Sequence, residues 1–210
     1  MHAPGQHAGY LLLRAQALLL LLLGKPVKAL SGFDRILALF PADRHALASR
    51  AHVLAQLNRL DESIVNLQQL TCLSGTHAQQ AAAWFNLGYV FQQKGQHDDA
   101  CPCFEKAVGH CPGMDRAWYG LGLALIGQGK LHEARQALKK TTTLQPLAPH
   151  GWYRLVQVDL ALGAPEKALE VLEHLRQFEP KVAAQLQRDM AAAFDRQDRQ
   201  QPQPADGNVC

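Results

Sequence analysis

The chain has 210 residues, of which 48% are hydrophobic and 19% are charged, and its formal net charge at pH 7 is +3. A charge balance this mild does not indicate a nucleic-acid-binding protein, and the length allows one or two domains with a hydrophobic core. Alanine, leucine and glutamine are abundant, which favours helices. The five cysteines are odd in number and lack the spacing of a disulfide framework, which is typical of a reducing compartment.

The first predicted element contains six consecutive leucines, in the stretch AQALLLLLLG at residues 15–24. A bilayer-spanning helix needs about 20 apolar residues, so this run is too short to span. A secretion signal needs only about 7–15 apolar residues, so length alone does not exclude one. Against a signal, residues 1–10 contain neither lysine nor arginine, and Lys25 and Lys28 lie where a cleavage region is usually uncharged.

Three later stretches of 34 residues, 81–114, 115–148 and 149–182, align with one another without a gap. Tryptophan, leucine, glycine, alanine, a large apolar residue and proline recur at fixed positions. The matching residues are Trp84, Trp118 and Trp152; Leu87, Leu121 and Leu155; Gly95, Gly129 and Gly163; Ala100, Ala134 and Ala168; Phe104, Leu138 and Leu172; and Pro112, Pro146 and Pro180. Each stretch predicts two antiparallel helices, the first ended by the glycine and the second by the proline.

This pattern resembles the tetratricopeptide repeat family, in which tryptophan, leucine-glycine, alanine, phenylalanine and proline recur over 34 residues. The resemblance implies an all-α fold, a right-handed superhelical solenoid of about five helix-turn-helix repeats closed by a C-terminal capping helix. Several positions depart from the family pattern, among them Phe91 and Leu125 where tyrosine is usual and Gly75 where proline is usual. Thr141 occupies a usual alanine site, and Val156 replaces a small glycine, so the helices of the last repeat are expected slightly further apart.

The same register extends upstream as far as Tyr10. Gly24, Ala29, Phe33 and Pro41 fit its turn, small, large and stop positions, so the leucine run becomes the first helix of the first repeat. Because this helix is apolar nearly all round, its outer side needs a cover from residues 1–9, a partner or a lipid surface. The predicted organisation is an N-terminal extension at 1–9, repeats at 10–43, 44–77, 81–114, 115–148 and 149–182, a capping helix at 183–198 and a disordered tail at 199–210.

The resemblance also implies a binding groove, lined by fixed positions on the first helix of each pair. These positions place an aromatic ladder of Phe85, Tyr119 and Tyr153 along the groove. The complete predicted set is Arg14, His52, Phe85, Asn86, Tyr89, Arg116, Tyr119, His150, Tyr153 and Arg154. The alternative is that some of these rings only pack between adjacent helices, because tyrosine is intermediate in burial.

Charge is also distributed unevenly between the predicted helices. Among the 18 acidic residues, only Asp115 and Asp159 fall on the first helices of the repeats. The bases there are Arg14, Arg44, Arg50, Lys94, Arg116 and Arg154. A positive groove would favour an acidic peptide or the C-terminal carboxylate of a protein partner. The alternatives are chance scatter and bases that point away from the groove. The residue set of carboxylate-clamp co-chaperones is largely unmatched, so a clamp of that kind is not predicted.

The chain carries no recognisable catalytic or metal-binding motif. Cys101 and Cys103 lie two residues apart on a predicted helix and diverge by about 200°, so they are interpreted as small core residues, not zinc ligands. No glycine-rich phosphate loop, H-E-x-x-H or G-x-S-x-G motif occurs. Because repeats, cap and tail use nearly the whole chain, we expect neither catalysis nor a cofactor.

The sequence therefore predicts a cytoplasmic adaptor, a protein–protein interaction scaffold that holds a segment of a partner protein and binds no nucleic acid. One alternative is an assembly factor that forms a homo-oligomer, or docks on a membrane complex, through the leucine-rich first helix. An exported or membrane-anchored protein, with residues 10–29 as the signal or anchor, is a related alternative. A third is a subunit that presents a substrate chain to a separate enzyme.

Overall fold

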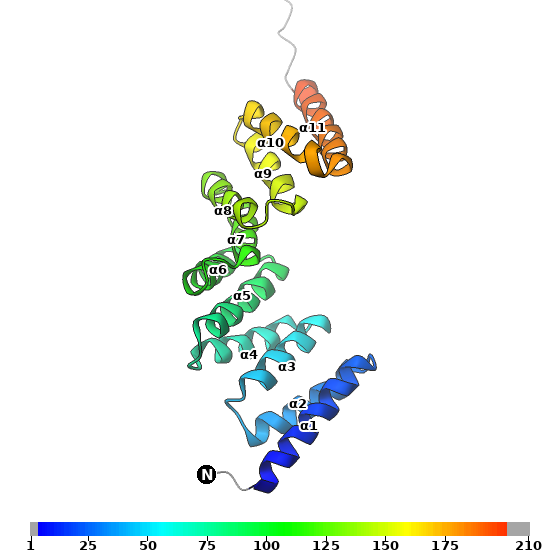
Figure 1. Ribbon diagram of the computed structural model, residues 1–210, viewed down its shortest axis with the longest axis vertical. Coiled ribbons are helices and arrows are strands. Elements are labelled where there is room, and N and C mark those ends of the chain that lie inside the picture. Colours follow the sequence, from blue (N-terminus) through cyan, green and yellow to red (C-terminus); the bar gives the residue numbers. More distant parts are fainter. Residues whose placement is uncertain (1–3, 201–210) are drawn as a thin grey trace, which may run out of the picture. The chain divides into compact units, whose positions relative to one another are not determined.

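The structure is a computed structural model that describes the backbone of residues 4–200 and the side chains of residues 9–188, 190 and 191. Within these residues every regular element is an α-helix (Figure 1). The helices are α1 (Pro4–Leu22), α2 (Pro26–Leu39), α3 (Arg44–Gln56), α4 (Leu60–Cys72), α5 (His77–Gln93), α6 (His97–His110), α7 (Asp115–Gly127), α8 (Leu131–Leu144), α9 (Pro149–Ala161), α10 (Pro165–Phe178) and α11 (Pro180–Gln200). The all-α prediction is therefore confirmed.

The described helices form two compact units, the first ending at Lys130 and the second beginning at Leu131. In the first unit α1 packs on α2, α3 on α4 and α5 on α6, and each of these pairs also contacts the helix that follows it. In the second unit α9 packs on both α8 and α10, and α10 packs on α11. Consecutive helices within each unit thus pack on one another, as the 34-residue period predicts, whereas α7 and α8 of the predicted repeat 115–148 belong to different units.

The turns inside the hairpins are made by residues with a left-handed backbone. The φ angles are 66° at Gly24, 73° at Gly95, 74° at Gly129 and 68° at Gly163, and Asn58 takes the same conformation at 59° where the repeat lacks glycine. Glycine adopts this region without a steric penalty and asparagine tolerates it better than most residues. The four glycines are the turn residues that the repeat register predicts.

A tryptophan side chain hydrogen-bonds to the proline that ends the preceding repeat, a contact that the repeat pattern did not reveal. The indole Nε1 of Trp118 donates to the main-chain carbonyl of Pro112 at 2.8 Å. In the second unit Trp152 makes the same bond to the carbonyl of Pro146, also at 2.8 Å. Each tryptophan therefore satisfies its polar N–H while its ring packs against the hairpin core.

Phe104 on α6 is fully buried in the first unit. A Cβ atom added at Gly88 on α5 would come within 3.1 Å of its ring, and one added at Gly120 on α7 within 2.6 Å. The missing side chains let the ring lie directly against two helix backbones. The equivalent residues Phe33, Leu67, Leu138 and Leu172 are also buried, so the predicted large apolar positions are core positions.

Helix α5 begins before the repeat boundary predicted at residue 81. Thr76 caps it: the Thr76 hydroxyl accepts from the main-chain N–H of Gln79 at 3.2 Å, and the Gln79 side chain accepts from the N–H of Thr76 at 3.0 Å. This reciprocal capping box stabilises a helix start at His77. Residues 78–80, which lie between two of the predicted repeats, therefore belong to the first turn of α5.

Both ends of the helical array differ from the predicted bounds. Helix α1 begins at Pro4 and takes in residues 4–9 of the predicted extension, and α11 runs from Pro180 to Gln200 where a cap at 183–198 was expected. Proline is well tolerated at the first position of a helix, where no N–H bond is required. Residues 201–210 of the predicted tail lie outside the described residues. None of the described helices has the length and apolarity to cross a bilayer.

Candidate functional site

Three of the predicted site residues share one side of α5. Phe85, Asn86 and Tyr89 are one to four positions apart, a spacing that places them on neighbouring rows of a helix. Asn86 and Tyr89 are exposed, and Tyr89 keeps 50% of its surface accessible. Phe85 is half-buried. The opposite side of α5 carries Leu87 and its buried neighbours, so this helix separates a core side from a solvent side.

Phe85 is held between two other rings. Its centroid lies 6.0 Å from that of Phe104 in the core and 6.4 Å from that of Tyr89, with the Tyr89 ring stacked at an interplanar angle of 25°. These separations fall in the range of favourable aromatic pairs. The row from Phe104 through Phe85 to Tyr89 therefore runs from the core to the surface, and the core fixes its inner end.

Helix α7 adds a cation to the same place. The guanidinium carbon of Arg116 lies 5.3 Å from the Phe85 ring centroid, within cation–π range. Arg116 is exposed and forms no ion pair or hydrogen bond within the described part of the chain. Tyr119, one helical turn further along α7, is half-buried. The aromatic face is defined as Phe85, Asn86, Tyr89, Arg116 and Tyr119.

The structure does not bring Arg14 into the aromatic face. Arg14 is half-buried on α1 and lines a cavity of about 30 Å³ beside Tyr10 and Asp43, which has room for a water molecule but not for a peptide. The hydroxyl of Tyr10 donates to Asp43 at 2.7 Å. Burial, followed by this hydrogen bond, raises the pKa of Tyr10 above its ordinary value. His52 is exposed on α3, and no contact joins it to the aromatic face.

The remaining predicted residues lie on α9 in the second unit. His150 is exposed, and Tyr153 is half-buried against the core of that unit. Arg154 donates to the side-chain oxygen of Gln157 at 2.9 Å. These three residues belong to a different unit from the aromatic face, so the predicted ladder through Phe85, Tyr119 and Tyr153 stays a prediction.

Three of the bases that support the predicted positive groove have partners elsewhere in the first unit. Arg44 donates to a main-chain carbonyl of the loop after α4 at 2.8 Å. Arg50 pairs with Asp34 at 2.7 Å, and Lys94 pairs with Asp61. Long basic side chains reach loops and neighbouring helices, so their position on a first helix does not place their charge in the groove. Arg116 is the base that contributes charge to the aromatic face.

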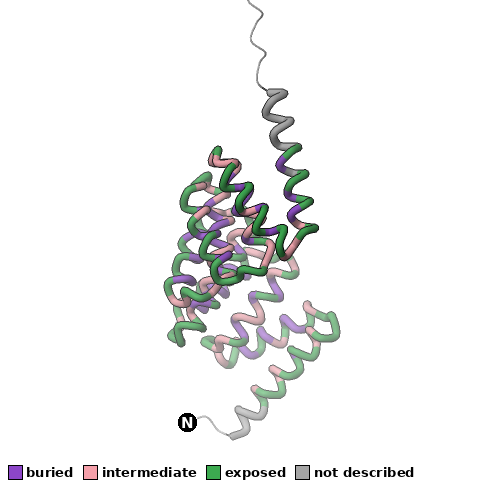
Figure 2. The backbone as a smooth tube through the Cα atoms, turned by 45° about the horizontal axis from the view of Figure 1, so that its top comes forward, coloured by how far each residue is buried: buried purple, intermediate pink, exposed green. Residues whose placement is uncertain are grey.

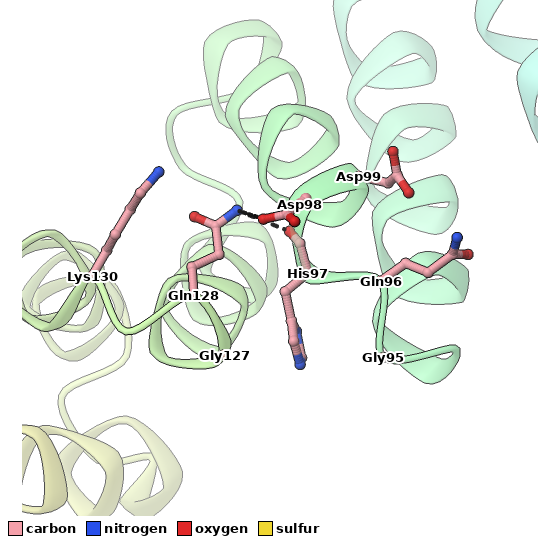
Figure 3. A pocket seen from close by; sticks show the side chains of 8 residues that line it. All are labelled: Gly95, Gln96, His97, Asp98, Asp99, Gly127, Gln128 and Lys130. Atoms are coloured by element: carbon pink, nitrogen blue, oxygen red, sulfur yellow. Dashed lines mark hydrogen bonds between the residues drawn. The ribbon is translucent and has the colours of Figure 1, made fainter.

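A polar hollow of about 570 Å³, which sequence reasoning did not single out, lies beside the turns after α5 and α7 (Figure 3). The side chain of Gln128 donates to Asp98 at 2.9 Å and to the carbonyl of His97 at 3.3 Å, so it joins the two turns. The His97 ring lies so close to Gly127 that an added Cβ would come within 2.4 Å of it. The lining residues are Gly95, Gln96, His97, Asp98, Asp99, Gly127, Gln128 and Lys130, none of them predicted site residues.

The cysteines of α6 are core residues, as predicted. Cys101 and Cys103 are each 5% exposed, and burial raises the pKa of the Cys103 thiol to about 11. Among the described residues there is no group of three or more histidine, cysteine, aspartate or glutamate side chains that could hold a metal ion.

The fold defines this chain as a helical repeat protein, with paired helices, left-handed turns and first helices that are solvent-facing on one side. Two tetratricopeptide repeat models match it, one over residues 79–146 and the other over residues 125–193. Together the matches run from residue 79 to residue 193, more than half of the chain. The chain belongs to the tetratricopeptide repeat family.

Solved structures with the same fold include MamA proteins and YrrB. MamA from Desulfovibrio magneticus RS-1 (residue 41 to the end) has a TM-score of 0.75 and 23% identity, covering 82% of this chain and 96% of that one. A MamA RS-1 double mutant has a TM-score of 0.74 and 22% identity, covering 87% and 97%. YrrB, described as a TPR protein with an unusual peptide-binding site, has a TM-score of 0.69 and 21% identity, covering 82% and 88%. No curated protein matches the sequence.

Proposed function

We propose that this protein is a protein–protein interaction scaffold whose aromatic face binds a segment of a partner protein. The observation that carries the proposal is the cluster of Tyr89, Phe85 and Arg116, in which an exposed ring stacks on a second ring that also contacts an exposed guanidinium. Tyrosine and arginine are enriched among the residues that dominate binding energy at protein interfaces.

The chemistry of the face favours an acidic segment. Arg116 has no carboxylate partner within the described residues, so a glutamate, an aspartate or a chain terminus could form a charge-assisted hydrogen bond with it. The exposed amide of Asn86 can both donate to and accept from the main chain of a bound segment. Tyr89 offers an apolar surface with a polar end, which suits a half-exposed contact.

The comparisons support the same class of function. The tetratricopeptide repeat family is a family of repeat proteins, and repeats of this kind create extended surfaces suited to binding. YrrB, which shares the fold at 21% identity, is described as having a peptide-binding site. We propose peptide binding for this chain on its own geometry, and the fold that it shares with YrrB adds weight to it.

The test is a selection of random peptides on the full-length chain, followed by measurement of the dissociation constant of the enriched peptides by fluorescence anisotropy. We expect enriched peptides to carry an acidic residue or a free C-terminal carboxylate. The substitutions Tyr89→Ala and Arg116→Gln should each weaken binding about 10-fold or more, because each removes a central contact.

Matched controls lie on the same unit away from the aromatic face. Val65 on α4 is 63% exposed and Arg35 on α2 is exposed, so Val65→Ala and Arg35→Gln remove an apolar and a cationic group of similar accessibility. We expect both controls to bind like the original protein. Equal losses in the controls and in the aromatic-face variants, or no enrichment of any peptide, would contradict the proposal.

A further inference from the structure

The side of α1 that faces away from α2 is an uninterrupted apolar surface. Ala17 is fully buried against α2, where an added Cβ at Gly32 would come within 2.9 Å of the Ala17 Cβ. On the other side Leu12 is 71% exposed and Leu22 is 85% exposed. The leucine face is defined as Leu11, Leu12, Leu18, Leu19, Leu22 and Leu23, all of them exposed. Soluble monomers rarely expose six contiguous large apolar residues.

In later repeats of the first unit, the positions equivalent to Leu12 and Leu19 are covered by the preceding pair of helices. The residues equivalent to Leu12 are Ala46, Ala83 and Ala117, and those equivalent to Leu19 are Val53, Val90 and Ala124, all of them buried. Ala46 and Val53 pack in one cluster with Phe33 of α2, the second helix of the preceding hairpin. The stacking interface of the repeats therefore continues to α1, where no described helix covers it.

The leucine side chains are too large for a helix to pack on α1 in the way that α2 packs on α3. Alanine and valine at the stacking positions of α3 and α5 allow the preceding helix to approach closely. Leu12 and Leu19 occupy the same positions with larger side chains, so such a helix could not come as near. The occupant must instead interdigitate with leucines.

We propose that the leucine face is a dimer interface, at which α1 packs against α1 of a second copy of this chain. Leu11, Ala15, Leu18 and Leu22 follow one another at steps of four, three and four residues, the spacing by which two like helices pack knobs into holes. A face of this kind is self-complementary, as a two-fold symmetric contact requires. The leucine face carries no charge that would select a partner of opposite sign.

A lipid surface fits the helix less well than a second copy does. Helices that lie on membranes usually carry lysine and arginine along their polar side and tryptophan, phenylalanine or leucine among their apolar residues. Within residues 4–22 the only lysine or arginine is Arg14, which lines the small cavity beside Tyr10 and Asp43, and there is no tryptophan. Lipid binding is therefore the alternative that the experiment must detect.

The test is size-exclusion chromatography with light scattering on the full-length chain, from about 1 to 100 µM, a range that brackets the affinity of ordinary dimers. We expect a dimer of twice the 23.1 kDa chain mass. Leu12→Gln combined with Leu19→Gln should raise the dimer dissociation constant more than about 100-fold, since four leucines leave the interface. Leu18→Gln with Leu22→Gln is a second variant, and circular dichroism checks that each is folded.

The matched control is Leu147→Gln combined with Leu169→Gln, which removes two leucines that are 72% and 56% exposed outside α1. We expect this control to dimerise like the original chain. A monomer at every concentration, folded leucine-face variants that dimerise normally, or equal loss in the control would overturn the proposal.

Sedimentation with vesicles of phosphatidylcholine and phosphatidylglycerol separates the two occupants. We expect the original chain to remain in the supernatant as a dimer. A monomeric chain that sediments with the vesicles, and no longer does so after Leu12→Gln with Leu19→Gln, would overturn the dimer and assign the leucine face to lipid.

Discussion

Helices α1 and α5 are first helices of their repeats, yet their surroundings are opposite. Helix α5 packs on α4 and α6, and it buries Ala83, Leu87 and Val90. Helix α1 packs on α2, and among its residues from Gly9 to Leu22 only Ala17 is buried. The tube of α1 in Figure 2 is accordingly green and pink over most of its coloured length. A residue's position in the repeat therefore predicts which way it faces, whereas its burial depends on whether a preceding hairpin is present.

The largest effect should come from truncating the large apolar core residue on the second helix of a repeat. Phe33 and Phe104 occupy equivalent positions and are 1% and 0% exposed. Either substitution by alanine should lower the free energy of unfolding by about 3–5 kcal/mol. We expect Phe104→Ala to be the more harmful, because its ring contacts two helix backbones, at Gly88 and Gly120. Urea denaturation followed by circular dichroism gives both values, and a greater loss for Phe33→Ala would contradict this ranking.

The second unit contains one buried and one exposed ion pair, and their contributions to stability should differ. Asp159 is fully buried and pairs with Arg135, which is 21% exposed. Asp159→Ala should destabilise the protein by about 3 kcal/mol, because it leaves a partly buried guanidinium without its carboxylate. The open pair of Arg176 and Glu173, 45% and 66% exposed, should contribute less than about 0.5 kcal/mol. Thermal unfolding of Asp159→Ala and Glu173→Ala compares them, and similar losses would show that burial does not decide the effect.

Glycine substitutions sharpen the comparison at the level of single atoms. Gly120→Ala places a methyl group 2.6 Å from the Phe104 ring, so we expect a loss of about 1–3 kcal/mol. Gly109 on α6 has no atom within 4 Å of an added Cβ. Gly109→Ala should therefore be neutral or stabilise by up to about 1 kcal/mol, through the higher helix propensity of alanine. Denaturation midpoints distinguish the two, and a neutral Gly120→Ala would mean that the helices are not closely packed there.

The smallest effect concerns cysteine reactivity and leaves stability unchanged. Because burial raises the pKa of Cys103 to about 11, roughly one thiol in a thousand is ionised at pH 8. Cys72 is exposed on α4. Iodoacetamide at pH 8 should label Cys72 long before Cys103, and Cys103 should become reactive as the pH approaches 11 or the chain unfolds. Mass spectrometry of the labelled peptides measures both rates, and equal rates would show that α6 does not protect its core side.

The regular features of the fold were readable from the sequence because each depends on one residue and its local geometry. Gly95 and Gly129 have the left-handed backbone that their spacing predicts, and Phe104 is in the core. The start of α5 was missed because the capping box of Thr76 and Gln79 lies outside the repeat pattern. Local hydrogen bonds of this kind override the period.

The candidate site was only partly predictable, because it depends on contacts between helices. The positions of Phe85, Tyr89 and Arg116 on the solvent side followed from the repeat register, but the contact of Arg116 with Phe85 did not. The partners of Arg44 and Lys94 could not be predicted, because they lie 29 and 33 residues away in the sequence. The position of a residue on a helix fixes its Cα atom, but the charged end of a long side chain can lie several ångströms away.

Hydrogen–deuterium exchange of the full chain, with and without an enriched peptide, tests the aromatic face most directly because it reports on each helix separately. We expect the peptide to slow exchange in α5 and α7, at residues 81–93 and 115–127, and to leave α1 unchanged. Slower exchange confined to α1, or to helices that carry no residue of the aromatic face, would contradict the proposed binding site.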